Sequence, residues 1–340
     1  MLVSDQIKIL NDRFASNFAD VVGTDLKWKD HKNYIPFESC PQSNKCRYCR
    51  GEQSAKYWEK IFDACICISL VNSDRVAEVS NEFHKNGLCQ YVIFFRPRRL
   101  ESYQYGKPKM ALSSLGCWTS HQYAAWCGKH VLEAERLLVF EDDVNFIVPI
   151  DHNEADFLSA QLSTLDQQKP NWDVFYLGHF SMYLAPISDA IWKTKSSEAH
   201  AYLLSSRGML NVGNAKFSSY HCPNKSSYEK LASAIDLYMA FHLQCYTTWK
   251  HYVVQKTQQE MPSHISSYSK LFYWAHDWKS THPQLCNILI VLIYLMLLFL
   301  AVFFVSKFLF SPSTTTLDRG QEINNNNNNN TEKIIYQNQR

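Results

Sequence analysis

The alternation of buried-strand and helix patterns over residues 64–178 places the strongest constraint on the fold of this chain. Residues 64–70 (ACICISL) and 88–95 (LCQYVIFF) are continuous apolar runs, and residues 137–140 and 173–177 repeat the pattern. Such runs are typical of strands that are buried on both faces of a sheet. Strands that alternate with helices predict an α/β fold whose sheet is mainly parallel and carries helices on both faces.

Two helices are expected between these strands. The first covers residues 76–85 and ends at Asn86-Gly87, because glycine favours the backbone conformation that terminates helices. The second is expected to begin at Ser120, whose hydroxyl can cap a helix. Its apolar face would consist of Tyr123, Ala124, Cys127, Val131 and Leu132.

The composition of the 340-residue chain narrows the class of protein. Hydrophobic residues make up 46% and aromatic residues 14%, so most of the chain can bury a core. The formal net charge is only +2, and no basic stripe runs along a predicted element. The sequence therefore argues against nucleic acid as a partner.

A long apolar segment lies near the C-terminus. Residues 285–306 contain no charged side chain, and residues 288–305 are almost entirely aliphatic or aromatic. A helix needs roughly 20 such residues to span a bilayer. Tyr273, Trp274 and Trp278 precede the segment, as expected for side chains at a membrane interface. We therefore predict an aromatic juxtamembrane linker over 271–284 and one transmembrane helix over 285–306.

The orientation of that helix follows less directly. Lys270 and Lys279 flank one side and Lys307 and Arg319 the other, so positive charge does not select a side. The N-terminus lacks a signal-peptide pattern, which favours a tail-anchored protein with its large domain in the cytosol; a lumenal domain stays open as the alternative. Residues 307–340 hold an asparagine run and are expected to be a disordered polar tail.

Three consecutive acids, Glu141, Asp142 and Asp143, follow the predicted strand at 137–140. Ligands of open α/β sheets bind beyond the carboxyl ends of strands, and carboxylates suit hard cations such as Mg²⁺ or Mn²⁺. Glu141 and Asp143 would project to the same side if strand geometry continued. The triplet by itself leaves two interpretations open, a metal site and a solvated acidic turn or helix N-terminus, and it does not favour the metal site without further context.

Several blocks around this triplet resemble glycosyltransferase family 25. They are Gly116-Cys117 with Ser120-His121, then Trp126, then the apolar strand into Glu141-Asp142-Asp143. Ile68-Ser69-Leu70 with Arg75, residues 172–178 (WDVFYLG), His200-Ala201-Tyr202, Ile235-Asp236 and residues 253–255 are similar to further blocks in the same order. The family includes lipopolysaccharide galactosyltransferases and procollagen galactosyltransferases, and the resemblance covers about residues 64–268.

The resemblance implies a GT-A type fold over residues 64–270, with a Rossmann-like nucleotide-binding half. It also implies inverting transfer of a hexose, most often galactose, from a UDP-sugar to an acceptor hydroxyl. Mn²⁺ or Mg²⁺ would be held by Glu141 and Asp143, and the residues expected near the nucleotide-sugar are Asp142, Ser120, His121 and Arg75.

The resemblance leaves the catalytic base open. Inversion requires a group that accepts the proton of the acceptor hydroxyl. Asp236 is the first candidate, although it could instead cap a helix, and the other candidates are Asp173 and His200. His121 could orient a phosphate or satisfy a buried backbone group.

The chain departs from the family pattern at four places. Ser69 stands where the family usually has Asn, Ser114 where it has an acid, Glu198-Ala199 where it has Gly-Thr, and Ser263-His264-Ile265 where it has Ser-Asp-Ile. These departures support a second hypothesis, a catalytically degenerate transferase fold that acts as a membrane-anchored binding or scaffold protein. The acceptor, whether protein or glycan, is not indicated by the sequence.

Residues 1–63 lie outside the resemblance. His31, Cys40, Cys46 and Cys49 could supply four zinc ligands, with Cys46 and Cys49 as a C-x-x-C pair. The alternative is an extension that packs on the sheet and keeps free thiols. The 11 cysteines show no repeating framework, which favours a reducing compartment.

Overall fold

The fold was obtained as a computed structural model. It describes residues 3–22, 26–27, 36–43, 56–99, 102–103, 109–179, 181–196, 198–215, 235–256, 289 and 292–303. The chain divides into two compact units, residues 1–281 and residues 282–340, and each is treated by itself.

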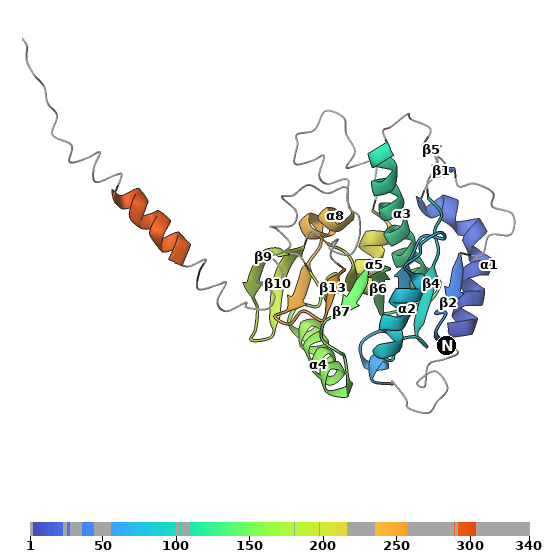
Figure 1. Cartoon of the computed structure of the whole chain (residues 1–340), viewed down its shortest axis with the longest axis horizontal. Helices are drawn as coiled ribbons and strands as arrows, with labels where there is room; N and C mark the ends of the chain where they lie inside the picture. Colours follow the sequence, from blue (N-terminus) through green and yellow to red (C-terminus); the bar gives the residue numbers. More distant parts are fainter. Residues whose placement is uncertain are drawn as a thin grey trace, which may run out of the picture. The chain divides into compact units, whose positions relative to one another are not determined.

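The first unit contains helices and strands in alternation (Figure 1). The helices are α1 (Val3–Val22), the 3₁₀ helix η2 (Lys56–Lys60), α2 (Val76–Lys85), α3 (Lys109–His130), α4 (His152–Gln168), α5 (Ser206–Gly213) and α8 (Ile235–His242). The strands are β1 (Leu26–Lys27), β2 (Phe37–Ser39), β3 (Ala64–Ile68), β4 (Val92–Phe95), β5 (Ser102–Tyr103), β6 (Arg136–Glu141), β7 (Val144–Phe146), β8 (Val174–Tyr176), β9 (Ser181–Pro186), β10 (Ile191–Ser196), β11 (Ala201–Ser205), β12 (Cys245–Thr248) and β13 (Val253–Gln255).

Nine of the described strands form one sheet in the order β2-β4-β3-β6-β11-β8-β12-β10-β9. Strand β3 pairs in parallel with both β4 and β6, and β8 pairs in parallel with β12. The other neighbours are antiparallel, because β11 runs back between β6 and β8 and β9-β10 close one edge as a hairpin. The predicted α/β class and the parallel pairing of the first strands are confirmed, within a sheet that is mixed as a whole.

Helices cover both faces of this sheet, as the strand patterns predict. On β6, Leu137 and Val139 belong to the apolar cluster that α1, α3, α5 and α8 build, while Leu138 and Phe140 belong to the cluster that α2 and α4 build. Alternate residues of a strand point to opposite faces, so the continuous apolar run at 137–140 serves two cores at once.

The N-terminal region is part of this domain. Leu10, Phe14 and Phe18 of α1 are buried against the sheet, and the side chain of Asn11 both accepts from the N–H of Phe37 and donates to its carbonyl (3.0 and 2.9 Å). Residues 36–43 therefore extend the sheet through β2, which pairs with β4. Cys40 is buried in the core as a free thiol, and the other three residues of the predicted zinc site lie outside the described residues.

The two predicted helices differ in how well their limits were foreseen. Helix α2 covers 76–85 as expected, and Gly87 adopts a φ of 66° directly after it. The prediction that Ser120 caps the second helix is wrong, because α3 already begins at Lys109. Residues 109–115 (KMALSSL) are mostly good helix formers and follow Pro108, so the helix starts eleven residues earlier. The Ser120 hydroxyl instead donates to the Gly116 carbonyl at 2.7 Å.

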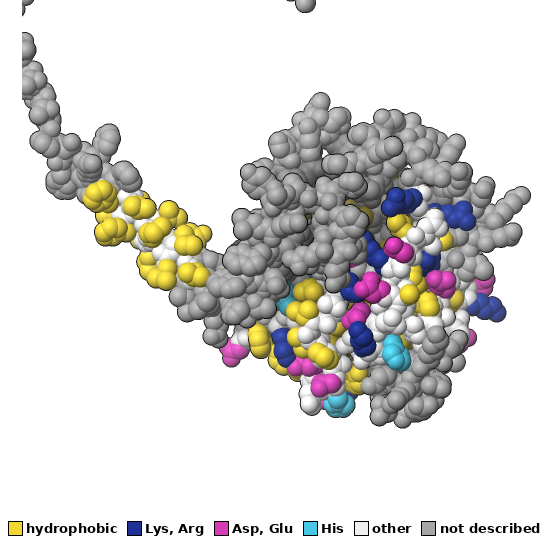
Figure 2. Space-filling view, viewed as in Figure 1, with side chains coloured by type: hydrophobic (Ala, Val, Ile, Leu, Met, Phe, Trp, Pro, Cys, Tyr) yellow, Lys and Arg dark blue, Asp and Glu magenta, His cyan; other side chains and the backbone are white. Residues whose placement is uncertain are grey.

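The predicted transmembrane segment is described only at residues 289 and 292–303. These residues are helical and exposed, and Figure 2 shows hydrophobic side chains along the helix. Among the described residues no helix combines the length and the apolar character needed to cross a membrane. The remaining residues of 285–306 and the tail at 307–340 lie outside the described part of the chain.

Candidate functional site

The sheet brings most of the predicted site residues to one edge. Strands β3 and β6 are parallel, so their carboxyl ends lie at the same level. Glu141 is the last residue of β6, and Ser69 comes directly after β3. The antiparallel strand β11 begins at this level, so His200 lies beside Glu141. The N–H of Glu141 donates a hydrogen bond to the His200 carbonyl at 2.9 Å. Strand ends that meet in this way form the usual ligand edge of an α/β sheet.

Glu141 is paired with His121 from helix α3. Nε2 of His121 lies 2.9 Å from Oε1 of Glu141, and Nδ1 of the same ring lies 2.6 Å from the Tyr202 hydroxyl. The thiol of Cys117, one helical turn before His121, is 3.9 Å from the same Glu141 oxygen. His121 therefore contacts a carboxylate and a phenol, and not the buried backbone group considered from its sequence.

Asp142 holds the loop after β3 in place. Its Oδ2 accepts hydrogen bonds from the hydroxyls of Ser69 and Ser73 at 2.7 and 2.6 Å. The guanidinium of Arg75 lies 3.5 Å from its Oδ1. With three partners around a side chain that is 14% exposed, this carboxylate is satisfied by its own chain.

Asp143 has one oxygen satisfied and one not. Its Oδ2 accepts from the Gln255 amide at 2.7 Å and lies 3.3 Å from the Arg75 guanidinium. Its Oδ1 is buried and has no hydrogen-bond partner among the described residues. A buried carboxylate oxygen without a partner is costly, so this atom is positioned to receive a ligand.

The electrostatic balance of the edge is strongly negative. Burial, together with the charge of Glu141, raises the pKa of Asp143 to about 7. Burial and the neighbouring carboxylates raise the pKa of Glu198 to about 7 and, despite the N–H of Leu237, that of Asp236 to about 6. Burial opposes ionisation of Glu141 as well, but the His121 ring outweighs it and holds the pKa of Glu141 below its usual value.

These residues fit a divalent cation. The anions of Asp143, Glu198 and Asp236 are disfavoured by burial and by neighbouring carboxylates, and a bound dication would reduce both penalties. The donors at Glu141 and Asp143 are hard oxygen ligands of the kind that Mn²⁺ and Mg²⁺ take. The unpartnered Oδ1 of Asp143 is the atom of this group that most needs such a ligand.

Gly178, two residues after β8, lets strand β13 approach the backbone closely beside the site. A Cβ at this position would lie 1.8 Å from the Val253 carbonyl oxygen and 2.7 Å from Nε2 of His200. His200 is buried there, with Nδ1 3.4 Å from the Glu198 carboxylate and Nε2 3.5 Å from the same Val253 oxygen. This tight contact explains why position 178, just after β8, is a glycine.

Asp236 lies in the first turn of α8, and its carboxylate accepts from the N–H of Leu237 at 2.8 Å. This is the helix-start role considered from the sequence. The charge of Glu141 raises the pKa of this carboxylate and His121 lowers it, while Asp236 in turn raises the pKa of Glu198. Asp236 therefore occupies both a helix start and the acidic edge.

Asp173 is not at this edge. It precedes β8 at the level of Ser205 and Arg136, about five residues along the strands from Glu141, which corresponds to roughly 16 Å. Its carboxylate accepts from the Asn211 amide and the Gln244 N–H, both at 2.8 Å, and lies 3.4 Å from Arg207. The contacts make Asp173 a structural residue that joins β8 to α5 and β12.

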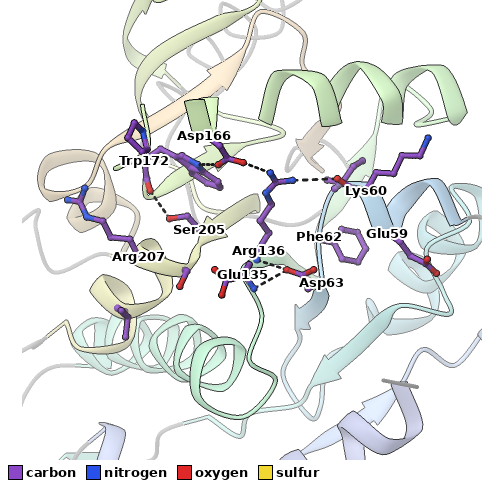
Figure 3. Close-up of a pocket in the computed structure, with 14 residues that line it drawn as sticks. Glu59, Lys60, Phe62, Asp63, Glu135, Arg136, Asp166, Trp172, Ser205 and Arg207 are labelled. Carbon is purple, nitrogen blue, oxygen red and sulfur yellow. Dashed lines mark hydrogen bonds and ion pairs between the residues drawn. The ribbon is translucent and has the colours of Figure 1, made fainter. Parts of the chain in front are cut away.

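The opposite edge also carries a cavity, of about 570 Å³ (Figure 3). There Arg136 pairs with Asp166, whose other oxygen accepts from the Trp172 indole at 2.7 Å. Asp63 accepts the N–H groups of residues 135 and 136. Arg136 and Asp166 thus neutralise each other, and none of the predicted site residues lines the cavity.

Three residues of the acidic edge were missed as site residues. Glu198 appeared in the sequence only as a departure from a family pattern, and Gln255 and Cys117 only as parts of blocks that resemble the family. Their contacts with His200, Asp143 and Glu141 depend on the pairings of β11 and of β13 with β7. The spacing of Cys117 and His121, one turn apart on a helix, was the one local signal available.

Comparison with known proteins adds little to this geometry. The sequence matches no family model and no curated protein. One solved structure, titled "Crystal Structure of A197 from STIV", aligns over 60% of this chain and 96% of its own, with 10% identity and a TM-score of 0.30. A TM-score at that level does not establish a shared fold.

Proposed function

We propose that this protein is a glycosyltransferase that moves a hexose, galactose in the first instance, from a UDP-sugar to an acceptor hydroxyl. The proposal combines the resemblance to glycosyltransferase family 25 with the mixed α/β sheet and the carboxylates at one of its edges; the GT-A type assignment is part of the proposal. The observation that carries it is the buried, unpartnered Oδ1 of Asp143 within a group of carboxylates at the ligand edge. The dication that accompanies a UDP-sugar would supply positive charge to these carboxylates and to the diphosphate.

Glu141 and Asp143 would hold the Mn²⁺ or Mg²⁺ ion. When bound, the cation neutralises charge on the diphosphate as it departs. Arg75 is placed to assist, because its guanidinium lies beside both Asp142 and Asp143 and is 35% exposed. Asp142 would be a positioning residue, because it accepts hydrogen bonds from Ser69 and Ser73 and so holds the loop before Arg75 at the end of β6.

Asp236 is our candidate for the base. Burial raises its pKa to about 6, so at neutral pH it is mostly ionised yet more basic than an ordinary aspartate. The acceptor hydroxyl gives its proton to this carboxylate while its oxygen forms a bond to the anomeric carbon. The bond from that carbon to the diphosphate breaks at the same time, and UDP leaves with the electron pair.

Glu198 is the second candidate for the base, because burial raises its pKa to about 7. His200, proposed from sequence as a base, is 2% exposed and lies beside Glu198, so it is better placed to orient that carboxylate than to meet an acceptor. Asp173 is left out of the mechanism because its carboxylate is bonded at the other edge of the sheet.

We further propose that the apolar segment at 285–306 anchors the domain to a membrane from its C-terminal side. The support is the sequence of the segment and the exposed apolar side chains of the described helix at 292–303. A tail-anchored arrangement with a cytosolic domain is the version that we put forward.

A degenerate transferase fold that only binds is the second candidate function. One observation favours it: Arg75 already contacts both Asp142 and Asp143, which partly supplies the charge that a cation would bring. The two functions separate in a thermal-shift titration with UDP and Mn²⁺. Ligand at 100 times its dissociation constant stabilises a folded protein by about 2.7 kcal/mol. An unchanged unfolding temperature at millimolar UDP and Mn²⁺ would favour the scaffold.

A further inference from the structure

Three different metal-binding side chains converge beside the acidic edge. They are Cys117 and His121 from α3 and Glu141 from the end of β6, and their ligand atoms all lie within 4.8 Å of one another. Cys117 and His121 share one face of the helix because four residues make about one turn. Strand β6 then brings the third donor to that face.

The separations suit a thiophilic cation. Zinc bonds of about 2.0–2.3 Å at tetrahedral angles place neighbouring ligand atoms roughly 3.3–3.6 Å apart. In this site Nε2 of His121 is 2.9 Å and Sγ of Cys117 is 3.9 Å from Oε1 of Glu141. Both separations to Glu141 are within a few tenths of an ångström of those values, and Sγ of Cys117 and Nε2 of His121 lie within 4.8 Å of each other, so the three side chains can supply three of four tetrahedral positions.

The His121 ring is already oriented for this role. Its Nδ1 lies 2.6 Å from the hydroxyl of the buried Tyr202, which can hold a proton on Nδ1. Nε2, which lies 2.9 Å from Glu141, then presents a lone pair toward Cys117 and Glu141 once its own proton is displaced. Histidines that bind metals are usually held in this way from the opposite ring nitrogen. His121 is 1% exposed and Cys117 is exposed, so the site is fixed on its inner side and open on its outer side.

We propose that Cys117, His121 and Glu141 form a binding site for Zn²⁺ or another thiophilic dication, which shares Glu141 with the hard-cation position but does not use Asp143. On binding, the Cys117 thiol and Nε2 of His121 each lose a proton to solvent, Nδ1 of His121 keeps its proton toward Tyr202, and the thiolate and the Glu141 carboxylate together balance the two positive charges. Water fills the open fourth position. This inference does not depend on the proposed glycosyl transfer, although both sites use Glu141.

Co²⁺ titration of the full-length protein tests the site, because cobalt bound to a thiolate gains a near-ultraviolet charge-transfer band. We expect the band in the wild type, its loss in Cys117→Ser, and competition by Zn²⁺. Affinity for Zn²⁺ should fall in Cys117→Ser by more than the roughly 10–100-fold typical of losing a partner behind a ligand. Tyr202→Phe should fall within that smaller range and keep the band.

Two further variants make the result decisive. Asp143→Asn should retain the cobalt band, because that residue belongs to the other position, whereas His121→Gln should weaken it. Circular dichroism confirms that each variant is folded. A band of equal intensity and affinity in the wild type and in Cys117→Ser would place the cobalt on other cysteines and overturn the proposal, as would the absence of any band in the wild type.

Discussion

Nε2 of His121 lies 2.9 Å from Oε1 of Glu141, and this contact joins helix α3 to the end of strand β6. The pairing gives Glu141 a pKa shift opposite in direction to those of its acidic neighbours. The His121 ring outweighs burial and keeps the pKa of Glu141 below its usual value, whereas burial raises the pKa of Asp143 and of Glu198 to about 7. One edge thus carries an ionised carboxylate beside carboxylates that are half protonated near neutral pH.

Replacing Asp143 with Asn should weaken Mn²⁺ binding at least tenfold, about 1.4 kcal/mol, and leave the fold intact. The change removes a carboxylate oxygen that has no partner in the described part of the chain, so no internal hydrogen bond of that oxygen is lost. Isothermal titration with Mn²⁺ measures the affinity. Asp142→Asn is the matched comparison, and it should cost more stability because Asp142 accepts from Ser69 and Ser73. Equal Mn²⁺ affinity in wild type and Asp143→Asn would contradict the site.

The stability of the metal-free protein should fall between pH 5 and pH 8. Burial raises the folded-state pKa of Asp143 and Glu198 to about 7 and that of Asp236 to about 6, above the ordinary carboxylate values of about 4. The folded protein therefore binds more protons than the unfolded chain in this range, and it loses that advantage as the pH rises through 6–7.

Urea unfolding with EDTA at pH 5, 6.5 and 8 measures this dependence. We expect the free energy of unfolding to drop by at least about 1.4 kcal/mol, the equivalent of one pKa unit, and saturating Mn²⁺ to reverse most of the loss at pH 8. The triple change Asp143→Asn, Glu198→Gln, Asp236→Asn should flatten the curve. Stability that rises with pH over this range in the metal-free protein would show that the acids are not buried as described.

Asp236→Asn should lower kcat by about 10²–10⁴-fold with little change in the KM for the donor, because a base acts on the acceptor proton and not on donor binding. Glu198→Gln tests the second candidate in the same way. The comparison is Asp173→Asn, which should keep kcat and lose about 1–3 kcal/mol of stability through its bonds to Asn211 and Gln244. A larger loss of kcat in Asp173→Asn than in Asp236→Asn would reverse the assignment.

Gly178→Ala should unfold the domain or disable the site. The added methyl would lie 1.8 Å from the Val253 carbonyl oxygen, so β13 and His200 must move. Gly213→Ala is the matched control, since its nearest contacts are at 3.4 Å or beyond and alanine favours a helix by up to about 1 kcal/mol. Thermal unfolding of both variants decides the point, and a Gly178→Ala protein as stable as the wild type would refute the close approach.

Deleting residues 282–340 should release the domain from membranes and leave its unfolding temperature unchanged, because those residues form a separate unit. Fractionation of cells that express the full and the shortened chain measures the first effect. A full-length chain found mainly in the soluble fraction would argue against the anchor.

The sequence allowed the central strands to be predicted because their signals are local. The apolar run at 64–70 covers β3, and the run at 137–140 lies within β6. Helix α2 ends before Asn86-Gly87, as expected. The start of α3 was missed because a serine that can cap a helix can equally bond within one, and Ser120 bonds to Gly116. Helix α1 was missed although its Leu10, Phe14 and Phe18 line one face.

The site was foreseen in part for a similar reason. Glu141 and Asp143 follow a recognisable strand, so their place at the ligand edge could be predicted. Glu198 reaches the same edge only through the antiparallel return of β11, and Asp173 is removed from it by the direction of β8. Both outcomes depend on long-range strand pairing, which no local pattern specifies.

A donor screen with the full-length protein tests the central claim most directly. UDP release is measured with Mn²⁺ from UDP-galactose, UDP-glucose and other UDP-sugars, for the wild type and for Asp143→Asn. We predict release from at least one UDP-hexose, UDP-galactose first, that requires the metal and falls at least about 100-fold in Asp143→Asn. No UDP release from any donor by folded wild-type protein that has bound Mn²⁺, or equal release by Asp143→Asn, would contradict the assignment.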